Sequence, residues 1–147
     1  MISEELWQAY RATSYEAETP AGRVRLRIGA KSPDVDRLLA ENGLSSWAFV
    51  TAFNPFSKAL TDTENEERHQ RLLHELTDHG RPVYEGSGVP DHPDWNAETS
   101  VMILGIEREA AVRLAVRYGQ NAIVFGTIET DVELVDCTKS GATSLGE

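Results

Sequence analysis

The sequence has little of several features that mark large classes of proteins. Its 147 residues include one cysteine, Cys137, which excludes an internal disulfide framework and suits a reducing compartment. The sequence has only 14 basic residues against 24 acidic ones, which gives a formal charge of −10. This charge argues against a general nucleic-acid binder, because neutralising phosphates requires a clustered basic surface. No apolar run approaches membrane-spanning length, and the first five residues lack the basic and apolar parts of a signal peptide. We therefore expect a cytoplasmic protein that binds neither nucleic acid nor membrane.

The apolar residues that are present recur in regular segments along most of the chain. At this length they suffice for one continuous core. We expect a single globular domain over 1–137. The residues 138–147 are polar and predict a flexible tail.

The N-terminal part predicts a short helix over 4–10 followed by a β-hairpin. Leu6, Ala9 and Tyr10 share one face of that helix. The segments 15–19 and 23–28 both alternate between polar and apolar residues, with a Pro-Ala-Gly turn between them.

The expected hairpin register places Glu18 opposite Arg23 and Glu16 opposite Arg25. A slip of one residue would turn the glutamates toward the apolar face. With Arg27, these arginines line one strand face, which has two interpretations: a phosphate-binding stripe, or cross-strand pairing with the glutamates. The acidic total favours pairing.

From Trp47 onward the order of elements is strand, helix, strand, strand, helix, strand. This order predicts an α+β sandwich of the ferredoxin-like βαββαβ type, with two helices on one face of an antiparallel sheet. The N-terminal hairpin and helix would be additions to that sheet, and a mixed sandwich of another connectivity is the alternative. The expected elements are a helix after Ser32-Pro33 that stops at Gly43, a strand over 47–53, a helix with a Thr63/Glu66 capping box that stops at Gly80, a strand over 83–85, a loop over 86–96, a strand over 98–106, a helix that stops at Gly119, and strands over 122–128 and 132–135.

Polar side chains occupy the ends of these core elements. Buried polar groups cost free energy unless they are paired, so such a cluster is a candidate site. In the expected antiparallel sheet, one cleft would collect Asn54, Asn65, Glu98 and Gln120, with His69 and Trp95 at its rim. Ser100 shares a strand face with Glu98 and completes the candidate ligand-binding residues, which are Asn54, Asn65, His69, Trp95, Glu98, Ser100 and Gln120.

Each of these residues also has a purely structural interpretation. Asn54 precedes a proline and would simply end a strand, and Gln120 follows a helix stop at Gly119. Glu98 is either a desolvated carboxylate with a raised pKa, suited to general acid or base chemistry, or a strand-end glutamate bonded to a neighbouring polar group. His69 is either a second candidate base or a satisfied buried imidazole. Trp95 either caps the pocket or pins its loop to the core.

We expect no metal and no cofactor. His74 and His79 resemble a zinc-protease pair, but their spacing is one residue too long to place both on one helix face. The Gly-Ser-Gly at 86–88 is followed by prolines and not by the helix that a phosphate-binding loop requires.

Several segments resemble the bacterial family catalogued as domain of unknown function 3293. They are Trp-Ala-Phe-Val-Thr-Ala-Phe-Asn-Pro-Phe-Ser at 47–57, Glu64-Asn65 with Arg68, Trp95 with Glu98 and Ser100, and Tyr-Gly-Gln-Asn-Ala-Ile-Val at 118–124. The resemblance covers a family-like core of about 45–126. It implies that the candidate polar residues belong to the family pattern, and it implies no established activity.

Three functions remain open. The first is a small domain with a polar pocket that binds a small ligand or a partner. The second is an enzyme at that pocket, with Glu98 or His69 as general base. The third is an acidic antitoxin- or immunity-like protein that masks a basic partner. The ligand, any reaction and the oligomeric state are not encoded in recognisable motifs.

Overall fold

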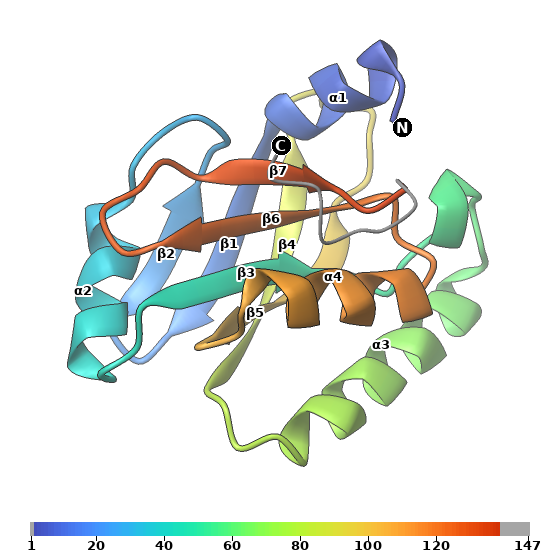
Figure 1. Cartoon of the computed structure of the whole chain (residues 1–147). Helices are drawn as coiled ribbons and strands as arrows, with labels where there is room; N and C mark the ends of the chain where they lie inside the picture. Colours follow the sequence, from blue (N-terminus) through green and yellow to red (C-terminus); the bar gives the residue numbers. More distant parts are fainter. Residues whose placement is uncertain (1, 139–147) are drawn as a thin grey trace.

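The computed structural model describes residues 2–138 as a mixed helix and sheet fold, built on one curled antiparallel sheet (Figure 1). The strands are β1 (Thr13–Thr19), β2 (Gly22–Leu26), β3 (Ser46–Val50), β4 (Val83–Pro90), β5 (Glu98–Leu104), β6 (Ala122–Thr127) and β7 (Glu133–Asp136). The helices are α1 (Glu4–Arg11), α2 (Pro33–Glu41), α3 (Asp62–Thr77) and α4 (Arg108–Arg117), with a 3₁₀ turn, η1 (Pro55–Ser57). The seven strands lie in the order β2-β1-β4-β5-β3-β6-β7, and every neighbouring pair is antiparallel.

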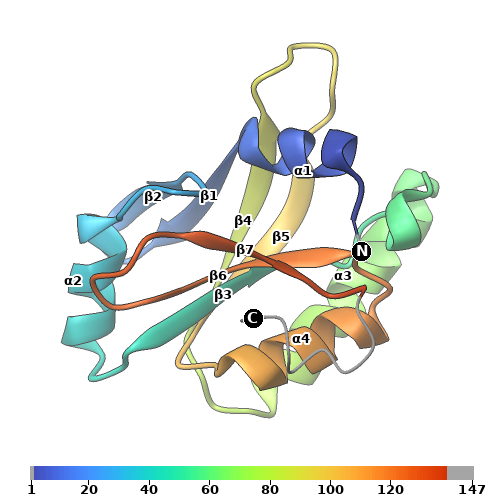
Figure 2. The same ribbon diagram turned by 45° about the horizontal axis from the view of Figure 1, so that its top comes forward.

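Both faces of the sheet are buried by helices. The long helices α3 and α4 pack on one face, and α2 packs on the other (Figure 1). Alternate residues of β3 therefore enter two cores, Ala48 and Val50 on the α3–α4 side and Trp47 and Phe49 on the α2 side. The short helix α1 lies at the opposite end of the sheet from α2, above the ends of the strands (Figure 2). None of its residues is buried.

The predicted hairpin register is confirmed. Glu18 faces Arg23 and Glu16 faces Arg25 across β1 and β2. The carboxylate oxygens of Glu16 lie 3.7 Å from side-chain nitrogens of Arg23 and Arg25. Arg27 forms a bidentate ion pair with Asp91, with N–O distances of 2.7 and 2.8 Å. The predicted pairing with the glutamates is therefore confirmed for Arg23 and Arg25, whereas Arg27 pairs with Asp91, outside the hairpin.

The strand β4 is much longer than the three residues predicted, because it pairs with β1 as well as β5. The glycines that indicated a loop instead let β1 approach closely: Gly86 lies opposite Ala17, and Gly88 lies opposite Tyr15. A Cβ added to Gly86 would lie 2.0 Å from the Glu16 carbonyl oxygen. The loop between β4 and β5 is correspondingly shorter than the predicted 86–96.

Several predicted boundaries also move. The capping box of α3 is Thr61 with Glu64, not Thr63 with Glu66: each side chain accepts from the other's backbone N–H at 3.1 Å. The strand β3 ends at Val50, three residues earlier than expected, and β5 ends at Leu104. The β6–β7 hairpin forms as predicted.

Two expectations concern the ends of the chain and the membrane. Residues 139–147, most of the predicted tail, lie outside the described residues. Across 2–138, each helix is too short or too polar to traverse a bilayer.

Candidate functional site

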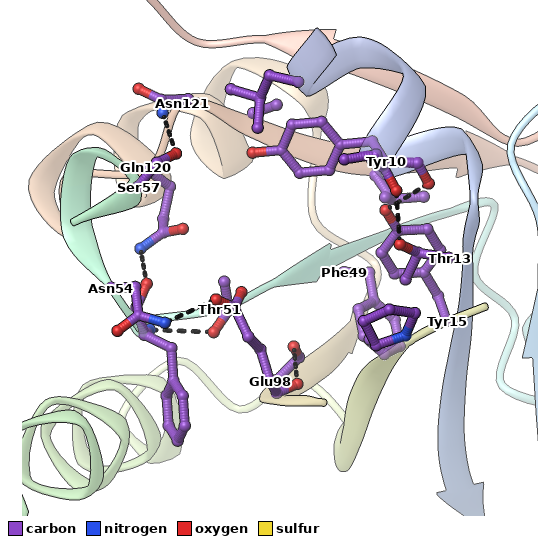
Figure 3. A pocket seen from close by; sticks show the side chains of 18 of the residues that line it. Tyr10, Thr13, Tyr15, Phe49, Thr51, Asn54, Ser57, Glu98, Gln120 and Asn121 are labelled. Carbon is purple, nitrogen blue, oxygen red and sulfur yellow. Dashed lines mark hydrogen bonds between the residues drawn. The ribbon is translucent and has the colours of Figure 1, made fainter. Parts of the chain in front are cut away.

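A cavity of about 330 Å³ lies at one end of the sheet, on the same face as α2 and beneath α1 (Figure 3). Its walls come from α1, the start of β1, the chain after β3, the end of β4, the start of β5 and the beginning of β6. The predicted site residues that line it are Asn54, Trp95, Glu98, Ser100 and Gln120.

Glu98 is the centre of this arrangement. It opens β5, and its Oε2 accepts a hydrogen bond of 2.9 Å from Nδ2 of Asn54 (Figure 3). Burial raises the pKa of the Glu98 carboxyl, and the bond from Asn54 opposes that rise without cancelling it. Within residues 2–138, Oε1 accepts no hydrogen bond, and this oxygen is not fully buried. One carboxylate oxygen is therefore fixed by the protein, and the other is available to a molecule in the cavity.

Asn54 is held in place by its own network. Its Oδ1 accepts from Nδ2 of Asn65 at 2.9 Å and from the backbone of Leu60 at 3.0 Å, and its backbone N–H donates to Oδ1 of Asn65 at 2.9 Å. Because both acceptor positions are used, the amide can only direct its NH₂ group at Glu98. Asn65 is 4% exposed and lies behind Asn54, outside the cavity.

The backbone around Asn54 is strained. Asn54, Phe56 and Ser57 have φ of 46°, 56° and 60°, in the left-handed region that non-glycine residues seldom adopt. Such strain costs about 1–3 kcal/mol per residue and persists only where the surroundings enforce it.

Hydrogen bonds from the turn after α4 hold this backbone in its strained conformation. The Phe56 N–H donates to the Gly119 carbonyl at 2.7 Å, and Nδ2 of Asn121 donates to Oγ of Ser57 at 2.8 Å. Nε2 of Gln120 donates to the Phe53 carbonyl at 2.9 Å, which ties the chain after β3 to the start of β6. Both interpretations of Gln120 thus describe the structure: it follows a helix stop, and it lines the cavity.

Arg68 stabilises the same corner from the α3 side. Its Nε donates to the Ala52 carbonyl at 2.7 Å, a second nitrogen donates to the Tyr118 carbonyl, and the guanidinium lies over the Tyr118 ring. Arg68 therefore positions the loop without entering the cavity.

The sequence interpretation missed the roof of the cavity. Leu6, Ala9 and Tyr10, which share one face of α1, all line it. The Tyr10 hydroxyl points into the open space (Figure 3), and burial, followed by the negative charge of Glu98, raises the pKa of that hydroxyl. The Tyr15 hydroxyl donates to the Tyr10 carbonyl at 3.0 Å, and Thr13 Oγ1 donates to the Ala9 carbonyl at 2.7 Å, which fasten α1 to β1.

The expectation that Asn65 lines the cleft with His69 at its rim is wrong. Both side chains extend from α3, which covers the face of the sheet opposite the cavity. The His69 side chain is 1% exposed, its Nε2 lies 2.8 Å from Oε1 of Glu85, and its ring stands edge-on to Phe53. His69 is therefore a buried imidazole, but it is satisfied only at Nε2, since Nδ1 has no hydrogen-bond partner within residues 2–138, and the side chain does not line the cavity.

Trp95 and Ser100 have contrasting surroundings. Trp95 lies at the mouth of the cavity, 54% exposed, and stacks on His92 with 5.2 Å between ring centroids. Ser100 is buried, and its hydroxyl donates to the Glu98 carbonyl at 3.0 Å. Among residues 2–138, no three His, Cys, Asp or Glu side chains gather in a way that could hold a metal ion.

The fold and the site define a small α+β protein with a cavity at the end of an antiparallel sheet. The chain belongs to the family described as "Protein of unknown function (DUF3293)", which matches residues 50–123 and confirms the resemblance seen in the sequence. No curated protein and no solved structure matches the chain. The matched residues include Asn54, Glu98 and Gln120, whereas α1 and β1 lie outside them.

Proposed function

We propose that this protein binds a small polar molecule in the cavity, with Glu98 as the anchoring group. The observation that carries the proposal is the partly buried Glu98 carboxylate, which lines the cavity and has one oxygen fixed by Asn54 while the other accepts no hydrogen bond from residues 2–138. Partial burial makes the charged carboxylate less stable than it is in water, so a ligand that supplies a hydrogen bond or a positive charge to the second oxygen is favoured.

A screen of small fragments by amide NMR would test this proposal. We expect the shifted resonances to belong to residues around Glu98 and Gln120, and we expect Glu98→Gln to lose these shifts while its Tm stays within a few degrees of wild type. The control is Glu66→Gln, which removes the same charge from an exposed position on α3. Fragments that bind Glu98→Gln as well as wild type, or a variant that unfolds many degrees earlier, would assign Glu98 a structural role instead.

An enzyme that uses Glu98 as a general acid or base is the second candidate. It is favoured by the raised pKa of Glu98 together with the Tyr10 hydroxyl in the same cavity, since such a carboxyl can exchange protons nearer neutral pH. This candidate predicts that Glu98→Gln retains ligand binding and loses turnover. The antitoxin- or immunity-like alternative rests on the net charge alone and remains a prediction.

For the fold, we propose that β3 to β6 with α3 and α4 form a ferredoxin-like unit extended by the β1–β2 hairpin and by β7. The spatial order β4-β5-β3-β6 with antiparallel neighbours supports this proposal.

A further inference from the structure

The side chains that line the cavity, in the part of the chain that the structure describes, include one acidic group and no basic one. Among residues 2–138, Glu98 is the only carboxyl group that lines it, and no lysine, arginine or histidine does. The nearby arginines are engaged elsewhere: Arg27 with Asp91, and Arg68 with the Ala52 and Tyr118 carbonyls. The pKa of Glu98 responds to burial and to Asn54, and no basic side chain offsets that burial. The carboxylate therefore has no counter-ion among the residues that the structure describes.

The remaining walls are rich in aromatic rings. They comprise Tyr10, Tyr15, Phe49, Phe53 and Trp95. Tyr15 and Phe49 pack edge to face with 5.6 Å between centroids, and they form one corner of the apolar floor. The faces of aromatic rings carry negative potential and attract cations, more strongly where water is excluded.

We propose that the ligand of this cavity is an organic ammonium ion, with its cationic nitrogen at Oε1 of Glu98 and its apolar body against the aromatic walls. The proposal rests on the ligand-binding function proposed above and gives that function a substrate class. An anionic ligand would meet Glu98 with no basic group to balance it. A neutral ligand would leave the partly buried carboxylate without an opposite charge. The formal charge of −10 also raises the local concentration of cations around the protein.

The volume restricts the ammonium ion further. A cavity of about 330 Å³ lies at the small end of the range for ligand sites, so a single ring on a short alkylamine chain suits it better than a polyamine or a peptide.

Calorimetric titration with three matched probes would test the charge preference. The probes are 2-phenylethylamine, 2-phenylethanol and 3-phenylpropionate, which share one apolar body and differ in charge. We expect the amine to bind at least about tenfold more tightly than the alcohol, and the carboxylate not to bind. Glu98→Gln should abolish the preference for the amine, whereas Glu66→Gln should retain it.

The pH dependence gives a second readout. An alkylamine stays protonated through the range in which Glu98 titrates, so the affinity for the amine should fall as the pH is lowered and Glu98 becomes neutral. The affinity for the alcohol should change little. This difference should disappear in Glu98→Gln.

The outcomes separate the two proposals. Equal or tighter binding of the alcohol or the carboxylate would overturn the ammonium inference and leave a ligand-binding cavity in place. Absence of binding by all three probes would also overturn it, because the single-ring amine is the ligand that the cavity is inferred to accept. Failure of the binding function itself would instead appear as an absence of fragment-induced shifts around Glu98.

Discussion

At the scale of single residues, Asn54 connects backbone strain to the chemistry of the cavity. Its left-handed conformation turns the side chain so that the amide reaches Glu98, Asn65 and the Leu60 N–H. Asparagine tolerates this conformation better than other non-glycine residues. The same residue therefore ends the strand and orients the carboxylate, and the two sequence interpretations of Asn54 are compatible.

Two substitutions separate these contributions. Asn54→Gly removes the side-chain hydrogen bonds but accepts the left-handed backbone, whereas Asn54→Ala removes the bonds and adds backbone strain. We expect alanine to be less stable than glycine by about 1–2 kcal/mol, and both to be less stable than wild type, because Nδ2 of buried Asn65 loses its acceptor. Urea denaturation measures the three free energies of unfolding. An alanine variant as stable as the glycine variant would show that the backbone here is not strained.

The stability conferred by Glu98 should depend on pH with a definite sign. Burial raises its folded-state pKa above the unfolded value, so protonation favours the folded protein. The favourable contribution is complete below the unfolded pKa and is lost as the pH rises through the folded-state pKa.

Glu98→Gln removes this dependence and retains an oxygen that can accept from Asn54. We therefore expect its Tm to equal or exceed that of wild type by a few degrees at neutral pH, with the difference shrinking as the pH falls through the raised pKa of Glu98 and the wild-type carboxyl becomes protonated. Scanning calorimetry across this range measures it. A difference that widens as the pH falls would contradict the raised pKa.

At the scale of elements, the sequence predicted what local patterns determine and missed what distant pairing determines. The hairpin register followed from alternation on both sides of one turn, so it needed no information beyond 15–28. The length of β4 could not be found in this way, because Gly86 and Gly88 become strand residues by pairing with β1 and β5, and local alternation does not reveal either partner. His69 lies on the buried stripe of α3, as expected, but the stripe does not reveal which face of the sheet the helix covers.

The helix α1 illustrates a signal that was present but could not be interpreted. Its apolar face, with Leu6, Ala9 and Tyr10, would be typical of a helix packed on a core, yet none of its residues is buried. That face lines a cavity instead, and only the three-dimensional arrangement reveals it. Convergence of Asn54, Glu98 and Gln120 was predictable because it follows from strand direction alone.

Removing residues 1–11 tests the role of α1 as a roof. Because the helix contributes no buried residue, we expect the sheet to remain folded with a modest loss of Tm. The open cavity should lose affinity for the amine probe, and the pKa of Glu98 should return toward its usual value, because burial is what raises it. Carboxyl-carbon NMR follows the titration of Glu98, and the matched control is Tyr10→Phe in the full chain, which retains the roof. An unchanged pKa after truncation would assign the desolvation to the sheet rather than to α1.

At the scale of the whole molecule, the excess of acidic residues opposes folding while it favours cationic ligands. Many arginines are already balanced in local pairs, such as Arg27 with Asp91 and Arg108 with Glu133. The remaining negative charge is distributed over a small compact body. Its mutual repulsion is weaker in the expanded unfolded chain.

Added salt should therefore stabilise the protein. Salt screens the net repulsion, which raises Tm, but it also screens the ion pairs, which lowers it. With a formal charge of −10 and exposed pairs that contribute little, repulsion should be the larger effect, and Tm should rise between about 0.01 and 0.1 M NaCl, where the screening length falls from about 30 to 10 Å. Asp91→Asn weakens both effects, because it breaks the pair with Arg27 and lowers the net negative charge by one. If repulsion is the larger effect, its Tm should rise slightly less with salt than that of wild type. A Tm that falls with salt in the wild-type protein, and falls less in Asp91→Asn, would instead identify the surface ion pairs as the dominant electrostatic contribution to stability.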